Sequence, residues 1–465
     1  MKKHIVIYIL LVCIVISLAS CTKNREIPTQ APTQAPETPT DQDEKLPLNI
    51  IDDNYRNIYE IYVESFFDSD GDGMGDVSGI TQKLDYIKNM GYDTVHLSQL
   101  YETGNLCVLK EGVADTESVT ELIKSARKVG LDVIADIDAT VVESSEDALT
   151  GVLTYWLSDL GFDGLNFTRA AEYSTSRAEI DHDGNIEFLS LVNRKAREIK
   201  SDCYLSCDVA VFDNETVAKY YGSGFDSIRI FSSADATGAV AGCLKRHNGE
   251  ELADLLVELH ETFKGNITTT YIGGATVSNR PATYMSGLEN VKMLAGIQMI
   301  MGGSVGTYYG DEIAMVSNDG NLLNMMRWNK NVGEAADYYY APADTQMNDD
   351  NSVYTFYAEM LYLRNALPSI ARGEVKKIEL TKNRAVCLIQ KTYNGETVTI
   401  LLNLASPTDP TDASTGARQI ELDKEILGYE KMAGQVCAYG SSYTASYDEE
   451  TQMLIMPPYS IVVFK

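Results

Sequence analysis

The first stretch whose residues could do chemistry is DSDGDGMGD, at residues 68–76. Its carboxylates recur at nearly alternate positions, and the glycines between them allow the backbone to wrap tightly. Carboxylates packed this closely repel one another unless a cation lies among them, and hard oxygen ligands suit Ca²⁺. The predicted calcium ligands are the side chains of Asp68, Asp70, Asp72 and Asp76 and the backbone carbonyl of Met74.

This loop is not an EF-hand. The position at which an EF-hand carries a bidentate glutamate is Gly79, and a strand-like run at 58–63 precedes the loop. The alternative to a calcium site is a solvated acidic turn. Either way, the loop lies between a predicted buried strand and the helix-like run that follows it.

The elements that must position this loop alternate between strand-like and helix-like along the chain. Strands are predicted at 58–63, 94–98, 133–137, 163–167, 203–207, 226–230, 267–272 and 304–308. Helices are predicted at 116–129, 147–160, 186–200, 250–263, 291–301 and 353–367. Repeated βα alternation implies a parallel sheet, and eight units imply a closed barrel. We therefore predict an α/β fold, with a (β/α)₈ TIM barrel at 48–374 and an all-β region at 375–465.

The beginning of the chain predicts export. Residues 1–20 have a charged start and an apolar run that is short for a membrane span, as in a secretion signal. The signal ends in Leu-Ala-Ser-Cys, which resembles a bacterial lipobox and implies that Cys21 is lipidated. The alternative is a plain signal-anchor helix. Residues 21–47 are rich in proline and threonine and predict an extended linker. The predicted location is the extracellular face of the cell membrane, with the lipid as anchor.

The net charge of −29 argues against nucleic acid as a partner and against binding to an anionic membrane surface. Six cysteines lie beyond the N-terminal segment, and they show no CxxC spacing of the kind that binds zinc. The sequence leaves open whether any of them form disulfides.

Several of these segments, taken in order, resemble the α-amylase superfamily of glycoside hydrolases. Residues 59–103 resemble its first strand, first helix and second strand, and in many relatives the same aspartate-rich loop holds a structural Ca²⁺. YYGDEI at 308–313 resembles the eighth strand and its following turn. The resemblance covers about 55–465 and implies that the C-terminal all-β region is a β-sandwich. It also implies an active site at the carboxyl ends of the barrel strands.

The catalytic residues that the resemblance leads one to expect are mostly replaced. Superfamily hydrolases use three carboxylates, an arginine beside the nucleophile and two histidines. Here the nucleophile position is Thr168, the arginine position is Asn166 and the third-carboxylate position is Thr276. The acid position alone keeps a carboxyl group, as Asp208, and neither expected histidine is present. The third strand keeps Asp136, but only 139–146 stand where relatives insert a domain.

Asp138 and Asp208 could form a substitute carboxylate pair, although aspartates at strand ends more commonly cap helices. The resulting prediction is a surface lipoprotein of α-glucan metabolism or binding that has lost hydrolytic activity. Two alternatives stay open. One is an active α-glucan hydrolase with a non-standard carboxylate set, and the other is a surface scaffold that binds a protein partner.

Overall fold

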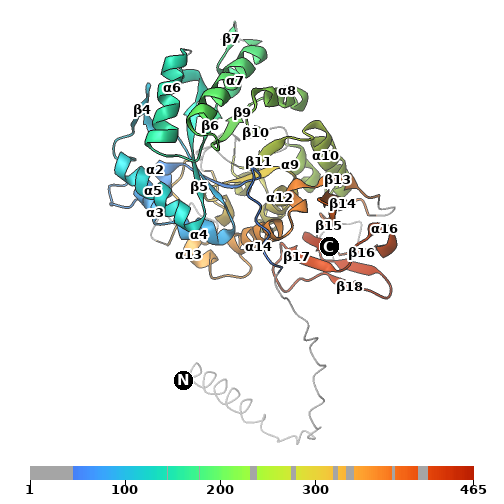
Figure 1. Ribbon diagram of the computed structural model, residues 1–465. Helices are drawn as coiled ribbons and strands as arrows, with labels where there is room; N and C mark the ends of the chain where they lie inside the picture. Colours follow the sequence, from blue (N-terminus) through green and yellow to red (C-terminus); the bar gives the residue numbers. More distant parts are fainter. Residues whose placement is uncertain are drawn as a thin grey trace, which may run out of the picture. The chain divides into compact units, whose positions relative to one another are not determined.

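Eight parallel strands close into a barrel, in the order β1-β12-β11-β10-β9-β6-β5-β2 (Figure 1). They are β1 (Asn57–Ile61), β2 (Thr94–Leu97), β5 (Asp132–Asp138), β6 (Gly164–Thr168), β9 (Tyr204–Asp208), β10 (Ser227–Ile230), β11 (Ile267–Tyr271) and β12 (Ser304–Tyr308). Every strand predicted for the barrel is present within two residues of its expected bounds. The (β/α)₈ fold is therefore confirmed.

This computed structural model describes residues 46–143, 145–176, 179–230, 238–273, 279–317, 323–330, 340–379, 383–406 and 417–465. Residues 47–465 form one compact unit. The segments predicted as signal and linker lie almost wholly outside the described residues, as does Thr276. Among the residues described, no helix combines the length and apolar character needed to cross a bilayer.

Helices cover the outside of the barrel. They include α3 (Val77–Thr81), α4 (Leu84–Met90), α5 (Thr116–Val129), α6 (Glu146–Thr154), α7 (His182–Ile199), α10 (Gly249–Thr262), α12 (Leu288–Ile300) and α14 (Val353–Ala366). The bounds of α5 match the prediction because both of its ends are marked locally. Asp115 and Ser118 form a reciprocal capping box at its start, and Gly130 ends it in the left-handed region at φ 74°.

Strand register brings charged residues side by side at the carboxyl end of the barrel. Glu60 of β1 is opposite His96 of β2, and Asp208 of β9 is opposite Arg229 of β10. Carboxyl ends of parallel strands meet at one end of a barrel, so these pairs share the region where active sites of this fold lie.

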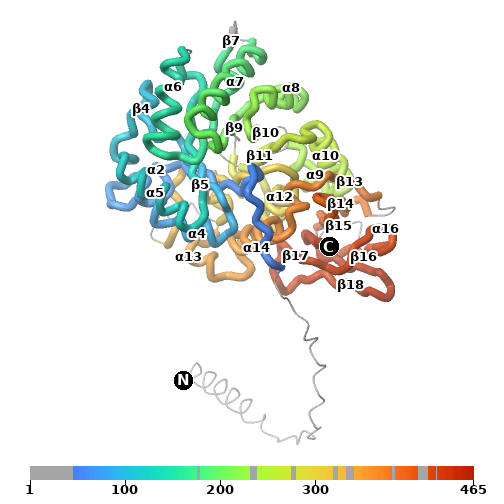
Figure 2. Tube along the Cα trace, in the orientation of Figure 1, coloured from blue at the N-terminus to red at the C-terminus, as the bar shows by residue number. Residues whose placement is uncertain are grey.

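Two antiparallel sheets form the C-terminal region. The larger holds β13 (Glu374–Lys377), β14 (Val386–Tyr393), β15 (Glu396–Asn403), β20 (Ser460–Phe464) and β17 (Met432–Cys437). The smaller holds β16 (Arg418–Glu421), β19 (Met453–Met456) and β18 (Ser446–Asp448). Residues of both sheets, such as Leu401 and Leu454, share one apolar core. Figure 2 shows these strands, in orange and red, beside α10, which contacts β13 and β14.

Inside the barrel, Gly306 of β12 leaves room for the ring of Tyr271. A Cβ atom at Gly306 would lie 1.9 Å from the Cζ atom of Tyr271. We expect Gly306→Ala to lower the free energy of unfolding by about 1–3 kcal/mol, because a packed interior cannot absorb the extra methyl group. Urea denaturation followed by circular dichroism measures the change.

The control is Gly151→Ala in α6, where a Cβ atom would meet nothing within 4 Å. Replacing an exposed helical glycine with alanine should stabilise the protein by up to about 1 kcal/mol. Equal effects of the two substitutions would contradict the tight packing assigned to Gly306.

Candidate functional site

A network of charged side chains fills the carboxyl end of the barrel. It contains Glu60, His96, Asp136, Asp208 and Arg229, each from a different strand and each at most 9% exposed. Buried charges are stable only when they are paired and hydrogen-bonded, so the pairing within this network decides what chemistry it can do.

Arg229 connects two of the carboxylates. Its Nη2 donates to Oε2 of Glu60, and its Nη1 donates to Oδ2 of Asp208 at 3.2 Å. The guanidinium also lies over the ring of Tyr271, 3.6 Å from the ring centroid. Ion pairing on one side and ring stacking on the other fix its orientation.

His96 supplies the second cation. Its Nε2 lies 2.7 Å from Oδ1 of Asp136, and its Nδ1 lies 3.9 Å from Oε2 of Glu60. Burial by itself lowers the pKa of His96, but the Asp136 carboxylate outweighs burial and the pKa lies above its ordinary value. The Asp136 carboxylate thus favours the charged form of this ring more than solvent does for a free histidine.

Asn166, for which the sequence resemblance led us to expect an arginine, joins the two aspartates. Its Nδ2 donates to Oδ1 of Asp136 at 2.8 Å and to Oδ1 of Asp208 at 3.4 Å. Its own Oδ1 accepts a 2.8 Å hydrogen bond from Oγ of Ser206. The two carboxylates thus approach within two hydrogen-bond lengths of each other. Burial raises the pKa of Asp208 to about 6, although Arg229 opposes this shift.

The other predicted positions behave differently. Thr168 ends β6 and is half-buried, opposite Asp138 in register. Asp138 is the N-cap of a short helix, where its Oδ1 accepts from the backbone N–H of Thr140 at 2.9 Å. Its Oδ2 accepts from Arg169 at 3.2 Å. The contacts of Asp138 are thus those of a capping residue, and the aspartate joined to Asp208 through Asn166 is Asp136.

Sequence reasoning did not single out Glu60, His96 or Arg229. A signal was available, because each is a charged or titratable residue within an otherwise apolar strand-like run. Such a residue in a buried strand must find a partner inside the barrel. Its partner depends on the register between strands, and this register cannot be read from the sequence of the individual strands.

The aspartate-rich loop offers a second candidate site. Single oxygen atoms of Asp68, Asp70 and Asp76 all lie within 4.8 Å of one another. Asp72 is not part of this cluster; its Oδ1 accepts from the backbone N–H of Met74 at 2.8 Å. Backbone N–H groups of Gly71 and Gly73 lower the pKa of Asp68, which favours its ionised form. An all-oxygen, anionic donor set fits Ca²⁺.

Asp208 makes stability depend on pH in a defined direction. Its pKa of about 6 in the folded protein exceeds its ordinary value of 3.8, so the native state holds the proton longer than the unfolded chain does. Stability from this group is full below about pH 4 and falls as the pH rises through 6, by about 3 kcal/mol. Asp208→Asn cannot lose a proton at this position, so relative to wild type it should gain about that amount between pH 4 and pH 7.

Urea denaturation of both proteins at several pH values measures this difference. Asp311→Asn is a suitable comparison, because burial also raises the pKa of Asp311, to about 7, at a separate pair with Arg280. The gain in stability of Asp311→Asn over wild type should therefore appear at a higher pH than the gain of Asp208→Asn. Stability curves of wild type and Asp208→Asn that run parallel would contradict the assignment.

Comparisons with known proteins show which proteins this chain resembles. A family model described as alpha amylase, catalytic domain, matches residues 60–147, which is less than half of the chain. Alpha-amylase 3 of Dictyoglomus thermophilum is 22% identical over 88% of this chain and 93% of its own length. Alpha-amylase SusG of Bacteroides thetaiotaomicron is 28% identical over 40% of this chain and 23% of its own length.

Among solved structures, Amy13B of Eubacterium rectale superposes with a TM-score of 0.79 at 23% identity, covering 90% of this chain and 97% of that one. This likeness shows the fold. The family model, the sequence relatives and the barrel together support the placement of this chain in the α-amylase superfamily of glycoside hydrolases.

Proposed function

We propose that this protein binds α-glucans at the carboxyl end of its barrel and does not hydrolyse them. The relatives named as α-amylases support the substrate class. The observation that carries the loss of hydrolysis is the pairing of Asp208, which is 3% exposed and bound by Arg229 and Asn166. A general acid must instead present its proton to the glycosidic oxygen.

The position of the nucleophile supports the same proposal. Thr168 ends β6 with a hydroxyl group where a retaining glycosidase needs a carboxylate. A threonine attacks only when a neighbouring base removes its proton. Arg169, the next residue, places a cation beside it that pairs with Asp138 and Glu172. Positive charge there opposes an oxocarbenium-like transition state.

A second candidate function is hydrolysis by Asp136 and Asp208, and the Asn166 bridge favours it. Two carboxylates held by one amide nitrogen come close to the separation of about 5–5.5 Å that retaining glycosidases use. Their unequal surroundings also suit separate acid and base roles, since the pKa of Asp208 is raised by burial. Against this candidate, the partners of both carboxylates are protein side chains.

Turnover and binding assays separate these candidates. We expect the purified protein to release no reducing sugar from starch or maltooligosaccharides and to give a saturable calorimetric titration with maltooligosaccharides. If Asp136 and Asp208 form a working pair, wild type will turn over substrate, and Asp136→Asn or Asp208→Asn will lower kcat by roughly 10²–10⁴-fold. Absence of both turnover and sugar binding would contradict both candidates and favour a scaffold that binds a protein partner.

The proposed location is the outer face of the cell membrane, with a lipid on Cys21 and residues 21–47 as a spacer. Residues 46–56 precede β1 and are bound near the amino ends of the barrel strands, for example through Arg372 and Asp53 at 2.7 Å. The spacer would thus join the domain at the end opposite Asp208.

We also propose that Ca²⁺ binds the aspartate-rich loop through Asp68, Asp70 and Asp76, with Asp72 and the carbonyl of Met74 as further expected ligands. The ion would stabilise the turn from α2 (Val63–Phe66) to α3 by neutralising its carboxylates. Because Ca²⁺ would bind the native state alone, it would add about 2.7 kcal/mol of stability at 100 times its Kd.

Excess EGTA should therefore lower the melting temperature by several degrees, and added Ca²⁺ should restore it. Asp70→Asn should melt at a lower temperature and should respond less to EGTA. Asp448→Asn is the matched control. Asp448 is an exposed aspartate at the end of β18 that accepts backbone N–H groups, and it belongs to no cluster of metal-ligating side chains among the described residues. A melting temperature of wild type that EGTA leaves unchanged would refute the calcium proposal.

A further inference from the structure

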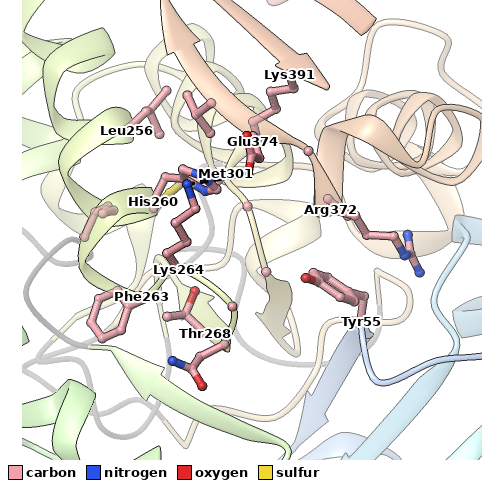
Figure 3. Close-up of a pocket in the computed structure, with 18 of the residues that line it drawn as sticks. Tyr55, Leu256, His260, Phe263, Lys264, Thr268, Met301, Arg372, Glu374 and Lys391 are labelled. Carbon is pink, nitrogen blue, oxygen red and sulfur yellow. Dashed lines mark ion pairs between the residues drawn. The ribbon is translucent and has the colours of Figure 1, made fainter. Parts of the chain in front are cut away.

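A cavity of about 290 Å³ lies between α10 and the beginning of the C-terminal sheet (Figure 3). Its walls include Tyr55, which precedes β1, Thr268 near the start of β11, and the Gly302–Gly303 turn before β12. The cavity therefore borders the amino ends of the barrel strands, opposite the end that holds Asp208. It is a separate feature from the site described above.

The lining of the cavity is partly apolar and partly basic. Leu256 and Leu259 of α10, with Phe263 directly after that helix, belong to the apolar part. The lining also contains the histidine and charged residues His260, Lys264, Arg372, Glu374 and Lys391 (Figure 3). Three of these are cations and one is a carboxylate, in a protein whose net charge is −29. A basic lining is thus a local departure from the charge of the whole chain.

The two cations nearer the surface already have anionic partners. Lys264 lies 3.5 Å from Glu374, and Arg372 binds Asp53 through two hydrogen bonds of 2.7 Å. Lys391 differs, because it is fully buried and its Nζ donates to the backbone carbonyls of Ile300 and Ile370, both at 2.6 Å. In the part of the chain that the structure describes, no carboxylate pairs with it.

The surroundings of Lys391 add positive charge. Arg364 is also buried, and it donates to the carbonyls of Met299, Met301 and Gly303. Burial lowers the pKa of Lys391, and the charge of Arg364 lowers it further. Isolated buried ammonium groups are unstable unless an anion compensates them.

Lys292 is a second buried lysine, and carboxylates act on its ammonium group. It too is buried, and its Nζ donates to the carbonyls of Asn351 and Ala438. Burial lowers the pKa of Lys292 as well, but Glu289 and Asp349 oppose that shift. It does not line this cavity. Both lysines therefore donate to backbone carbonyls, but the carboxylates that favour the ammonium form of Lys292 have no counterpart at Lys391.

His260 provides a second group without a partner. Its Nε2 atom is buried and makes no hydrogen bond within the described structure. Burial lowers the pKa of His260, so the neutral ring is favoured and Nε2 can carry a donor proton. Charges on Lys391 and Lys264 act on this ring, which places all three groups around one space.

We propose that this cavity binds a small anion, whose carboxylate or phosphate group accepts hydrogen bonds from Lys391 and His260. Lysine is a common partner of both groups as a point charge. The volume is near the lower end of the range for small-molecule sites, and the apolar part of the lining would cover the uncharged part of such a ligand.

The test titrates full-length protein with inorganic phosphate and with succinate, in separate calorimetric experiments at constant ionic strength. Binding of either anion supports the proposal, and the comparison identifies phosphate or carboxylate as the preferred group. Lys391→Met should weaken that binding by roughly tenfold or more, because a charged hydrogen bond is lost. Lys292→Met removes an equally buried lysine away from the cavity and should leave the anion affinity unchanged.

Two results would overturn the proposal: neither anion binds wild type, or Lys391→Met binds as tightly as wild type does. If Lys391→Met does not fold, wild-type crystals soaked in phosphate decide the question. In parallel soaks with succinate, either anion within hydrogen-bond distance of Nζ of Lys391 would support the site, and a cavity that holds neither anion would refute it.

Discussion

The ion pairs of Arg229 with Glu60 and Asp208 are the constraint on which the carboxyl end of this barrel depends. Three carboxylates are buried there, counting Asp136, and none could stay ionised in a low-dielectric interior without a cation beside it. Arg229 and His96 supply those cations from strands that lie far apart in the sequence. Space for the stacked Tyr271 ring, and hence for Arg229, depends in turn on the glycine at position 306.

The same charge compensation sets the chemistry that is open to this end of the barrel. Hydrolysis needs carboxyl groups that face the substrate, whereas Asp136 and Asp208 face His96, Asn166 and Arg229. β6 contributes the uncharged Asn166 to this network, and the positive charge comes from β2 and β10. A network that satisfies its own hydrogen bonds stabilises the fold, but its paired carboxyl groups are not free to donate a proton to a glycosidic oxygen.

Features set by neighbouring residues could be predicted from the sequence, and features set by register could not. The strands, the bounds of α5 and the convergence of Asp68, Asp70 and Asp76 follow from local patterns. The pairing of Glu60 with Arg229 joins β1 to β10, which are not neighbours in the sheet, and it requires the barrel to close before the two residues meet. Asp138 shows why the role of a strand-end aspartate is hard to predict. The sequence is the same whether its carboxylate is free or caps a helix, and here it caps one.

At the opposite end of the barrel, two buried cations are bound by backbone carbonyls. Arg364 and Lys391 are held there by backbone carbonyls from the end of α12, from the turn before β12 and from the short helix before β13. The bonds of Lys391, which lies in β14, tie the C-terminal sheet to the barrel. Carbonyl dipoles at a helix end favour a nearby cation, but they carry no net negative charge. At the carboxyl end each cation meets a carboxylate of the same chain. Beside the cavity, Lys391 has only dipoles, so the compensating charge for its ammonium form must come from outside the described chain or the ammonium must give up its proton.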